Sequence, residues 1–592
     1  MNKKPSAPEP SWLRYSPLLI LLLTLLLHLP TARLGFVYLD DDILVLSNHE
    51  KLSHISNVGQ AFRSDAFFAN MSPYYRPMMN VSFMVDAMAG GTSPAIYHTT
   101  NAVLHALACV SLFWLLELLG FSRVKAFAGA VLFSIHPMMG HAVNWIPARG
   151  DLLVALFGIL SFGSLIRYIK ETKPVYLIAH SLSLAAALFS KESAVLFPFL
   201  FIGWFLLKKV PLRNTRTLFV VGSWLMIYAG WFYLRTISID HRDDGQLGFH
   251  ALLKNMPFLP EAVARFFFPF GLPVTPVFSA GFTLAGIGIT AVLLGMVVRK
   301  REKGATYLML FGMVWFLSFC FPNMYVRLES ANDSFEYLLH RTYLPYIGFL
   351  IVVLALLPDS WIITKRKVNR WGLGVMALVL SVTTVAQQAK YQDAISYWGS
   401  AIRYAPEKAW FHYFMGRYYF KLKDNKRFGD YLRVADSLKT YPEFRYQLGM
   451  VAMIEDKDYD LAYRYFSDAL KNGYGGKEAH DNFVGLCIES SSDLFKKGMY
   501  EKAISRCKEA LTNDPGNAVA AYNLGIYLVT IGEKQRAASM WRRALHNKPD
   551  MAAACRSLCL YYQYDVKKAD SAAWFAREFK KLGGTGELIS PQ

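Results

Sequence analysis

Long apolar segments confine most of this chain to a membrane. Between residues 13 and 388 the sequence repeatedly runs through Leu, Ile, Val, Phe and Ala, whereas residues 389–592 are rich in charged side chains. Over the whole chain 54% of the residues are hydrophobic, more than an ordinary soluble protein carries. The sequence therefore predicts an all-α protein in two parts, a polytopic membrane helix bundle followed by a soluble helical domain.

The apolar half divides into about eleven candidate spans. The first run, Leu18 to Leu29, resembles a signal peptide but lacks a small-residue cleavage pattern, so we expect a retained anchor. Several segments are shorter than the roughly 20 residues of an isolated span, which predicts tight packing. The segments are 13–34, 98–119, 125–138, 150–167, 175–190, 193–207, 217–235, 276–298, 305–322, 342–358 and 371–388.

Basic residues gather in alternate connections between these spans. By the positive-inside rule this set faces the cytoplasm. We therefore predict a cytoplasmic N-terminus at 1–12, a transmembrane domain at 13–388 with an outer loop at 35–97, and an outer-face domain at 389–592. Much of the net charge of +19 is then a topology signal, so it calls for no nucleic acid. The basic residues are Lys3, Lys4, Arg14, Arg123, Lys125, Arg167, Lys170, Lys173, Lys208, Lys209, Arg213, Arg216, Arg299, Lys300, Arg301, Lys303, Lys365, Arg366, Lys367 and Arg370.

Charged and titratable residues collect on the predicted outer face. Taken singly, each has an ordinary explanation, because loop acids are usually solvated and a lone arginine near a span end usually reaches for headgroups. Together, several cations and two or three acids at one membrane level suggest a site for a lipid-linked anion. A carboxylate there could act as a base. The residues are Asp40, Asp41, Asp42, Arg76, His98, His105, His136, His141, Arg149, Asp151, Lys191, Glu192, His340 and Arg341.

The soluble half contains a 34-residue repeat. Small and aromatic residues fall at the offsets of a tetratricopeptide unit, in which two paired helices touch through small residues. The unit that precedes the clearest one has Ala503, Ala510 and Pro515 at the matching positions. Weaker units surround Gly416 and Gly449. We predict a solenoid of about five imperfect units that binds proteins or peptides. The clearest unit has Gly525, Ala537, Trp541, Ala544 and Pro549.

Other chemistry is weakly represented. The six cysteines show no metal-binding spacing, and Cys555 and Cys559 are better explained as small packing residues than as a disulfide. No nucleotide-binding glycine loop is present. We expect no metal and no cofactor.

Six short motifs, in order along the chain, resemble the transmembrane and tetratricopeptide-repeat O-mannosyltransferases and their bacterial relatives. No single motif is specific, but the ordered set is, and the resemblance covers essentially the whole chain. The motifs are Phe36 to Asp41 with Asn48; Tyr75-Arg76-Pro77; Tyr97-His98 with Asn101 and His105; His136-Pro137 with Trp145-Ile146 and Arg149-Gly150-Asp151; Ser190-Lys191-Glu192; and Arg341 to Pro345 with Gly348.

The resemblance implies a C-type glycosyltransferase that transfers a sugar from a polyprenyl phosphate, with inversion, on the periplasmic or lumenal face. It makes Asp40 the expected base, with Asp41 second, and a protein or glycan the acceptor held by the repeats. Mannose is only one candidate sugar. The expected substrate-binding residues are Arg76, Arg149, Lys191 and Arg341 for phosphate, with Glu192, His98, His105, His136 and His340 beside them.

The chain departs from the family pattern in two places. His340 stands where relatives often carry an acid, and the first two repeats are degenerate.

Two other functions stay open at this point. One is a membrane scaffold whose transferase site has decayed and whose repeats recruit proteins. The other is a ligase or flippase for lipid-linked sugars, which would not require an acidic pair so close to the first span.

Overall fold

The computed structural model describes residues 11–68, 72–239, 249–275, 277–299, 303–325, 338–358, 361 and 367–585. Every regular element in these ranges is a helix, so the predicted all-α class is confirmed. The chain forms two compact units, residues 1–405 and 406–592. The predicted domain border at 388/389 marked the end of the last apolar segment, 371–388. The first unit also takes in α19 (Ala394–Tyr404).

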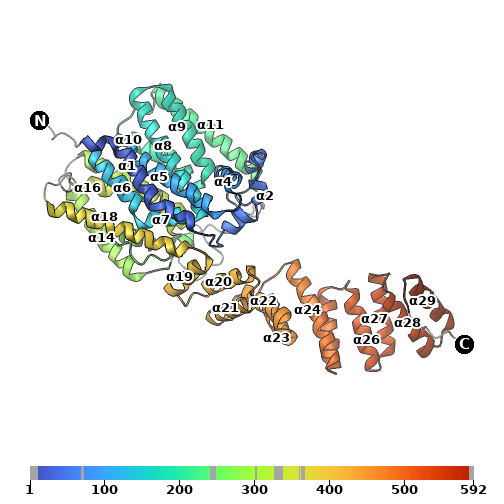
Figure 1. Ribbon diagram of the computed structural model, residues 1–592. Helices are drawn as coiled ribbons and strands as arrows, with labels where there is room; N and C mark the ends of the chain where they lie inside the picture. Colours follow the sequence, from blue (N-terminus) through green and yellow to red (C-terminus); the bar gives the residue numbers. More distant parts are fainter. Residues whose placement is uncertain are drawn as a thin grey trace, which may run out of the picture. The chain divides into compact units, whose positions relative to one another are not determined.

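The first unit is a bundle of apolar helices (Figure 1). Proline opens several of them, at Pro94, Pro137, Pro174 and Pro345, because its missing N–H is no loss in the first turn. The main helices are α1 (Ser16–His28), α4 (Pro77–Gly90), α5 (Pro94–Leu119), α6 (Arg123–Ile135), α7 (Pro137–Asn144), α8 (Arg149–Glu171), α9 (Pro174–Ser190), α10 (Phe197–Leu207), α11 (Thr215–Ser238), α12 (Phe249–Asn255), α13 (Phe258–Phe267), α14 (Ala280–Arg299), α15 (Lys303–Met324), α16 (Pro345–Leu356) and α18 (Lys367–Gln388).

All eleven predicted apolar segments coincide with helices, but they differ in length. Within the described ranges, seven are long and apolar enough to cross a bilayer, and an eighth span would join α6 and α7 across a bend of 57°. Helices α9, α10 and α16 are shorter. The number of about eleven spans therefore stays a prediction. Of the residues used for the orientation, Lys3, Lys4, Lys300, Arg301, Lys365 and Arg366 lie outside the described residues.

Small residues let the helices approach closely. A Cβ atom added to Gly348 of α16 would lie 2.5 Å from the carbonyl oxygen of Gly312 in α15, so no larger residue fits at this crossing. Membrane helices commonly use such contacts because dispersion, with no hydrophobic driving force between them, must hold them together. The contact fixes the start of α16, just after the predicted site residues His340 and Arg341.

The second unit is a row of five antiparallel helix pairs within residues 406–585 (Figure 1). The repeat signature acts as predicted, since a Cβ at Gly525 would lie 2.3 Å from the Trp541 indole nitrogen. All six cysteines are buried thiols. The pairs are α20 (Ala409–Lys421) with α21 (Asn425–Leu438), α22 (Pro442–Val451) with α23 (Tyr459–Lys471), α24 (Lys477–Lys496) with α25 (Tyr500–Asn513), α26 (Ala518–Thr530) with α27 (Lys534–Asn547), and α28 (Ala552–Leu560) with α29 (Ala569–Lys581).

Candidate functional site

The predicted acids lie in a strained turn, residues 37–42 (the acid turn), between α1 and the short helical segment η3 (Asp42–Leu46). Tyr38 and Asp40 have φ angles of 56° and 66°, in the left-handed region that side-chain-bearing residues avoid. Asp41 holds this turn. Its buried carboxylate accepts the N–H groups of Val37 at 2.7 Å and Leu39 at 3.1 Å. Strain maintained in this way is common at functional sites.

Asp40 is placed differently from its neighbour. Its half-buried carboxylate receives no hydrogen bond and forms no ion pair with any described residue. Burial raises the pKa of Asp40 to about 6; nearby Asp42 adds to this, while Arg76 and Arg341 oppose it. Burial also raises the pKa of Asp41 to about 7, against its backbone hydrogen bond from Val37. Asp40 is therefore the member of the pair whose oxygen atoms are available to a new partner.

Three cations, Arg76, Lys191 and Arg341 (the cation cluster), lie close enough to influence one another. Arg76 and Arg341 both lower the pKa of Asp40, and both also act on Lys191. The cluster therefore combines residues from the outer loop, the turn after α9 and the segment η8 (Leu339–Thr342). Positive charge next to an acid of raised pKa is an arrangement found at sites that bind and transform anions.

Acidic partners orient two of these cations. Glu192 contacts Arg76 at 3.0 Å through both Nε and Nη2, and its Oε1 accepts the Tyr75 N–H at 2.9 Å. The Arg76 guanidinium also lies 4.4 Å above the Tyr74 ring. Asp151 contacts the Lys191 ammonium at 2.6 and 2.7 Å. Glu192 thus lies in the site as predicted, but its contacts make it a partner of Arg76.

Trp145 connects the acid turn with the segment that carries Arg341. Its indole N–H donates to the Leu39 carbonyl at 3.0 Å, and its ring lies 4.7 Å from the His340 imidazole. Burial, followed by Lys191 and Arg341, lowers the pKa of His340 well below its usual value, which favours the neutral imidazole. Asp151 was among the charged residues expected on the outer face, whereas Trp145 was quoted only as a member of a motif. The position of Trp145 shortly before Arg149 is the signal that could have marked it as a site residue.

Arg149 is completely buried and has its own set of partners, which together with it we call the Arg149 cluster. It forms an ion pair with Asp86, and its other nitrogens donate to Asn101 Oδ1 and the Tyr97 carbonyl, both at 2.8 Å. The guanidinium carbon also lies 4.4 Å above the Phe83 ring. A guanidinium with so many internal partners has little capacity left for a phosphate, which favours a structural role.

Three predicted histidines bond to the interior of the bundle. His98 contacts the Gly35 carbonyl at 3.2 Å, at the base of the acid turn. His105 contacts the Tyr343 hydroxyl at 2.7 Å. His136 contacts the Phe266 carbonyl at 2.9 Å, while its other nitrogen accepts the Met138 N–H and caps α7. These contacts favour supporting roles for all three, and their direct contact with substrate stays a prediction.

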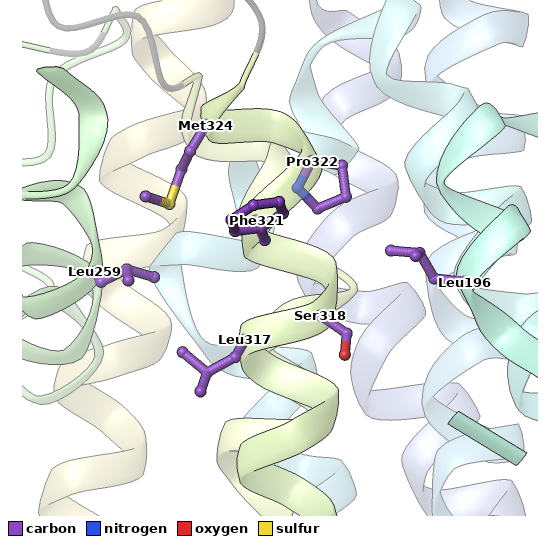
Figure 2. A pocket seen from close by; sticks show the side chains of 7 residues that line it. All are labelled: Leu196, Leu259, Leu317, Ser318, Phe321, Pro322 and Met324. Carbon is purple, nitrogen blue, oxygen red and sulfur yellow. The ribbon is translucent and has the colours of Figure 1, made fainter. Parts of the chain in front are cut away.

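An apolar hollow of about 470 Å³ opens beside α15. Leu196 and Leu259 approach this helix from two sides in Figure 2. Leu196 ends the segment η6 (Glu192–Leu196), which begins at the partner of Arg76. Among the described residues, no three His, Cys, Asp or Glu side chains gather as metal ligands. The hollow is lined by Leu196, Leu259, Leu317, Ser318, Phe321, Pro322 and Met324.

Comparison with known proteins bears on both units. The tetratricopeptide repeat family matches residues 383–442 and 490–557. Solved structures similar to part of this chain include a MamA RS-1 ArsTM double mutant (19% identical, TM-score 0.24, 30% of this chain and 94% of that one). Another is YrrB, described as a TPR protein with an unusual peptide-binding site (20% identical, TM-score 0.22, 33% of this chain and 93% of that one).

Curated relatives match part of the chain. The protein O-mannosyl-transferase Tmtc1 of Drosophila melanogaster is 30% identical over 178 residues, 29% of this chain and 20% of that protein. The human protein O-mannosyl-transferase TMTC2 is 33% identical over 161 residues, 25% of this chain and 18% of that protein. The chain thus spans about a fifth of the length of these relatives. They confirm the resemblance to transmembrane and tetratricopeptide-repeat O-mannosyltransferases.

Proposed function

We propose that this chain, with relatives named as protein O-mannosyl-transferases, is an integral-membrane inverting glycosyltransferase. It moves a hexose, with mannose the first candidate, from a polyprenyl-phosphate donor to a hydroxyl group of a protein. The reaction takes place on the periplasmic or lumenal side. The observation that carries the proposal is the unpaired Asp40 carboxylate near Arg76 and Arg341, which together with Lys191 form the cation cluster.

The chemistry needs one base and one anion site. The Asp40 carboxylate takes the proton of the acceptor hydroxyl, whose oxygen attacks the anomeric carbon of the sugar. The bond from that carbon to the phosphate oxygen breaks, and the lipid phosphate leaves with the bonding electron pair. A single displacement of this kind inverts the anomeric centre. The raised pKa of Asp40 suits a base, since a base works best when its pKa lies near the ambient pH.

The cation cluster would stabilise the departing phosphate. Arg76 and Arg341 can each present two parallel N–H donors to phosphate oxygens, and Lys191 adds a third positive charge. Glu192 and Asp151 hold Arg76 and Lys191 in place before substrate arrives. Such preorganised charge stabilises a developing anion without further rearrangement. No divalent metal is required in this scheme.

The apolar hollow suits the lipid part of the donor. Its walls are almost entirely hydrocarbon, and Leu196 follows Glu192 by one short helical segment. A prenyl chain in this hollow would therefore leave its phosphate near the cation cluster. Chain length is not specified by a hollow of this size.

The repeats would hold the acceptor protein. Arrays of this kind bind extended peptides along their inner face, and the charge pattern predicts the repeats and the acid turn on one side of the membrane. Reporter fusions after Gly35 and after Tyr391 test this arrangement. We expect both reporters outside the cytoplasm; opposite compartments would contradict it.

Glycan loss tests the function itself. Envelope proteins and lipids are compared by mass spectrometry in wild type, in a deletion, and in the deletion carrying Asp40→Asn or the exposed loop control Glu50→Gln. Specific glycopeptides should disappear in the deletion, return with Glu50→Gln and stay absent with Asp40→Asn. Full rescue by Asp40→Asn would instead favour a scaffold. Loss confined to glycolipids would favour a ligase or flippase.

A further inference from the structure

Helix α7 carries buried polar groups that the proposed chemistry does not use. The chain bends by 57° between α6 and α7, and α7 ends at Asn144, directly before Trp145. His141 and Asn144 are three residues apart, so they share one side of the helix. Their side chains are only 3% and 1% exposed.

The hydrogen-bonding capacity of these groups is largely unfilled. Neither the nitrogen nor the oxygen of the Asn144 amide has a partner among the described residues. His141 uses Nδ1 on the Tyr391 hydroxyl at 2.7 Å, and its Nε2 is unpartnered. The Oε1 atom of Gln387, on the helix α18 that packs against α7, also lacks a partner.

Asn101 shows how a purely structural amide is treated in the same bundle. It is equally buried, yet its oxygen accepts from Arg149 Nε at 2.8 Å and its nitrogen contacts the carbonyls of Val143 and Trp145. Buried polar groups are nearly always paired in this way, and an exception calls for a missing partner. Asn144 is such an exception at both of its polar atoms.

The unfilled groups lie beside the proposed site. Trp145, the next residue, contacts both the Leu39 carbonyl in the acid turn and the His340 ring next to Arg341. His141 is also close enough to His340 to affect it electrostatically. The C-terminal end of α7 therefore borders both the proposed base and the proposed phosphate site, which is where the sugar of the donor must lie.

We propose that Asn144, with His141 beside it, binds hydroxyl groups of the transferred hexose; this rests on the proposed function. A primary amide offers two donors and two acceptor sites, and adjacent sugar hydroxyls can each donate and accept. The amide can therefore form hydrogen bonds with two adjacent hydroxyls, and the imidazole can bond to a third. The cation cluster would bind the phosphate group, which all lipid phosphates have in common, whereas α7 would select the sugar.

The proposal makes a distinctive prediction for Asn144→Leu. Leucine has a similar size and removes an amide that has no partner, so the unliganded protein should keep or gain stability. Binding of mannosyl phosphoryl farnesol should weaken by at least tenfold. Binding of farnesyl phosphate, which lacks the sugar, should stay unchanged. A paired structural amide gives the matched control: Gln388 donates to the Leu27 carbonyl, and Gln388→Leu should lower stability without changing the affinity for one ligand relative to the other.

The experiment measures both affinities and the thermal midpoint for the purified full chain in detergent. A selective loss of the mannosyl ligand in Asn144→Leu supports the assignment. Equal weakening of both ligands, or no change in either, overturns it. If the wild-type protein binds neither lipid, the proposed function itself fails. If it binds both and Asn144→Leu changes nothing, only the sugar assignment fails.

Discussion

The Arg149 cluster and the cation cluster with its neighbouring acids both combine basic and acidic side chains, but they differ in whether every charged group has a partner among the described residues. Arg149 is enclosed by Asp86, Asn101 and Tyr97, and its ion pair is wholly buried. Arg76 and Arg341, which also act on Lys191, lie near the Asp40 carboxylate, which has no partner within the described chain. The first arrangement is complete without a ligand, and the second is not. Charge alone therefore does not identify a site, but incomplete pairing does.

The largest expected effect is on catalysis by Asp40. Asp40→Asn removes the proposed base while leaving the turn intact, because asparagine tolerates a left-handed backbone at least as well. We expect the transfer rate to fall by about 100-fold to 10,000-fold, the usual contribution of a general base. Single-turnover kinetics with a mannosyl phosphoryl prenol measure this. Unchanged kinetics would show that the unpaired carboxylate beside the cation cluster is not a base, and incomplete pairing would then no longer mark this cluster as the site.

Asp41→Asn is the matched neighbour of that variant. Its amide can accept only one of the two backbone N–H groups that Asp41 accepts, so the turn should lose about 1–3 kcal/mol of stability. A fall in thermal midpoint should accompany any loss of rate. A rate loss equal to that of Asp40→Asn at full stability would assign the base to Asp41.

Breaking the Arg149 cluster should affect folding first. Arg149→Met leaves Asp86 buried without its partner, and we expect a loss of about 3–5 kcal/mol in the free energy of unfolding. Adding Asp86→Leu should restore much of that loss. Chemical unfolding in detergent measures both variants. Weakened donor binding at full stability would show that Arg149 contacts the phosphate after all.

Removing a charge from the cation cluster should affect binding more than folding. Arg341→Gln should weaken the affinity for a prenyl phosphate by roughly 10-fold to 100-fold, as expected for one charge-assisted contact. Equilibrium binding of farnesyl phosphate measures the change. The surface variant Arg536→Gln, in the repeat unit, provides a control that should leave this affinity unchanged.

The smallest effect expected is on pH dependence. The raised pKa of Asp40 predicts that transfer slows about tenfold for each pH unit below about 6, as the carboxylate takes up a proton. Because the folded form binds that proton more tightly than the unfolded chain, wild type should gain stability relative to Asp40→Asn as the pH falls from 7 towards 4. A rate that is flat between pH 5 and 7 would contradict the assignment.

Sequence patterns predicted the helices and the repeats well because both depend on local composition. The apolar segments and the Gly525–Trp541 contact follow from spacing alone. The bend before α7 was not predicted, although Pro137 stood at the end of the chain's third apolar segment and starts a new helix. The shortness of α9, α10 and α16, by contrast, agrees with the short segments predicted at 175–190, 193–207 and 342–358.

The division of the site residues into two clusters could not be predicted in the same way. Whether Arg149 is available to bind a phosphate depends on its ion pair with Asp86, which lies 63 positions away in the sequence. One signal was available: Asp86 is an acid in the apolar stretch Pro77–Gly90, and such an acid usually has a buried partner. The difference between Asp41, which holds the turn, and Asp40, whose carboxylate has no partner among the described residues, depends on backbone angles. Two adjacent identical residues in a sequence do not reveal these angles.

The left-handed backbone at Tyr38 and Asp40 has a consequence for protein engineering. Glycine or asparagine would adopt these angles more easily than the residues present. A library selected for thermal stability alone should therefore drift towards Gly or Asn at positions 38 and 40, and at position 40 this would remove the proposed base. Selections on this scaffold need an activity readout in every round, because the residues that selection for stability would replace first include the proposed base.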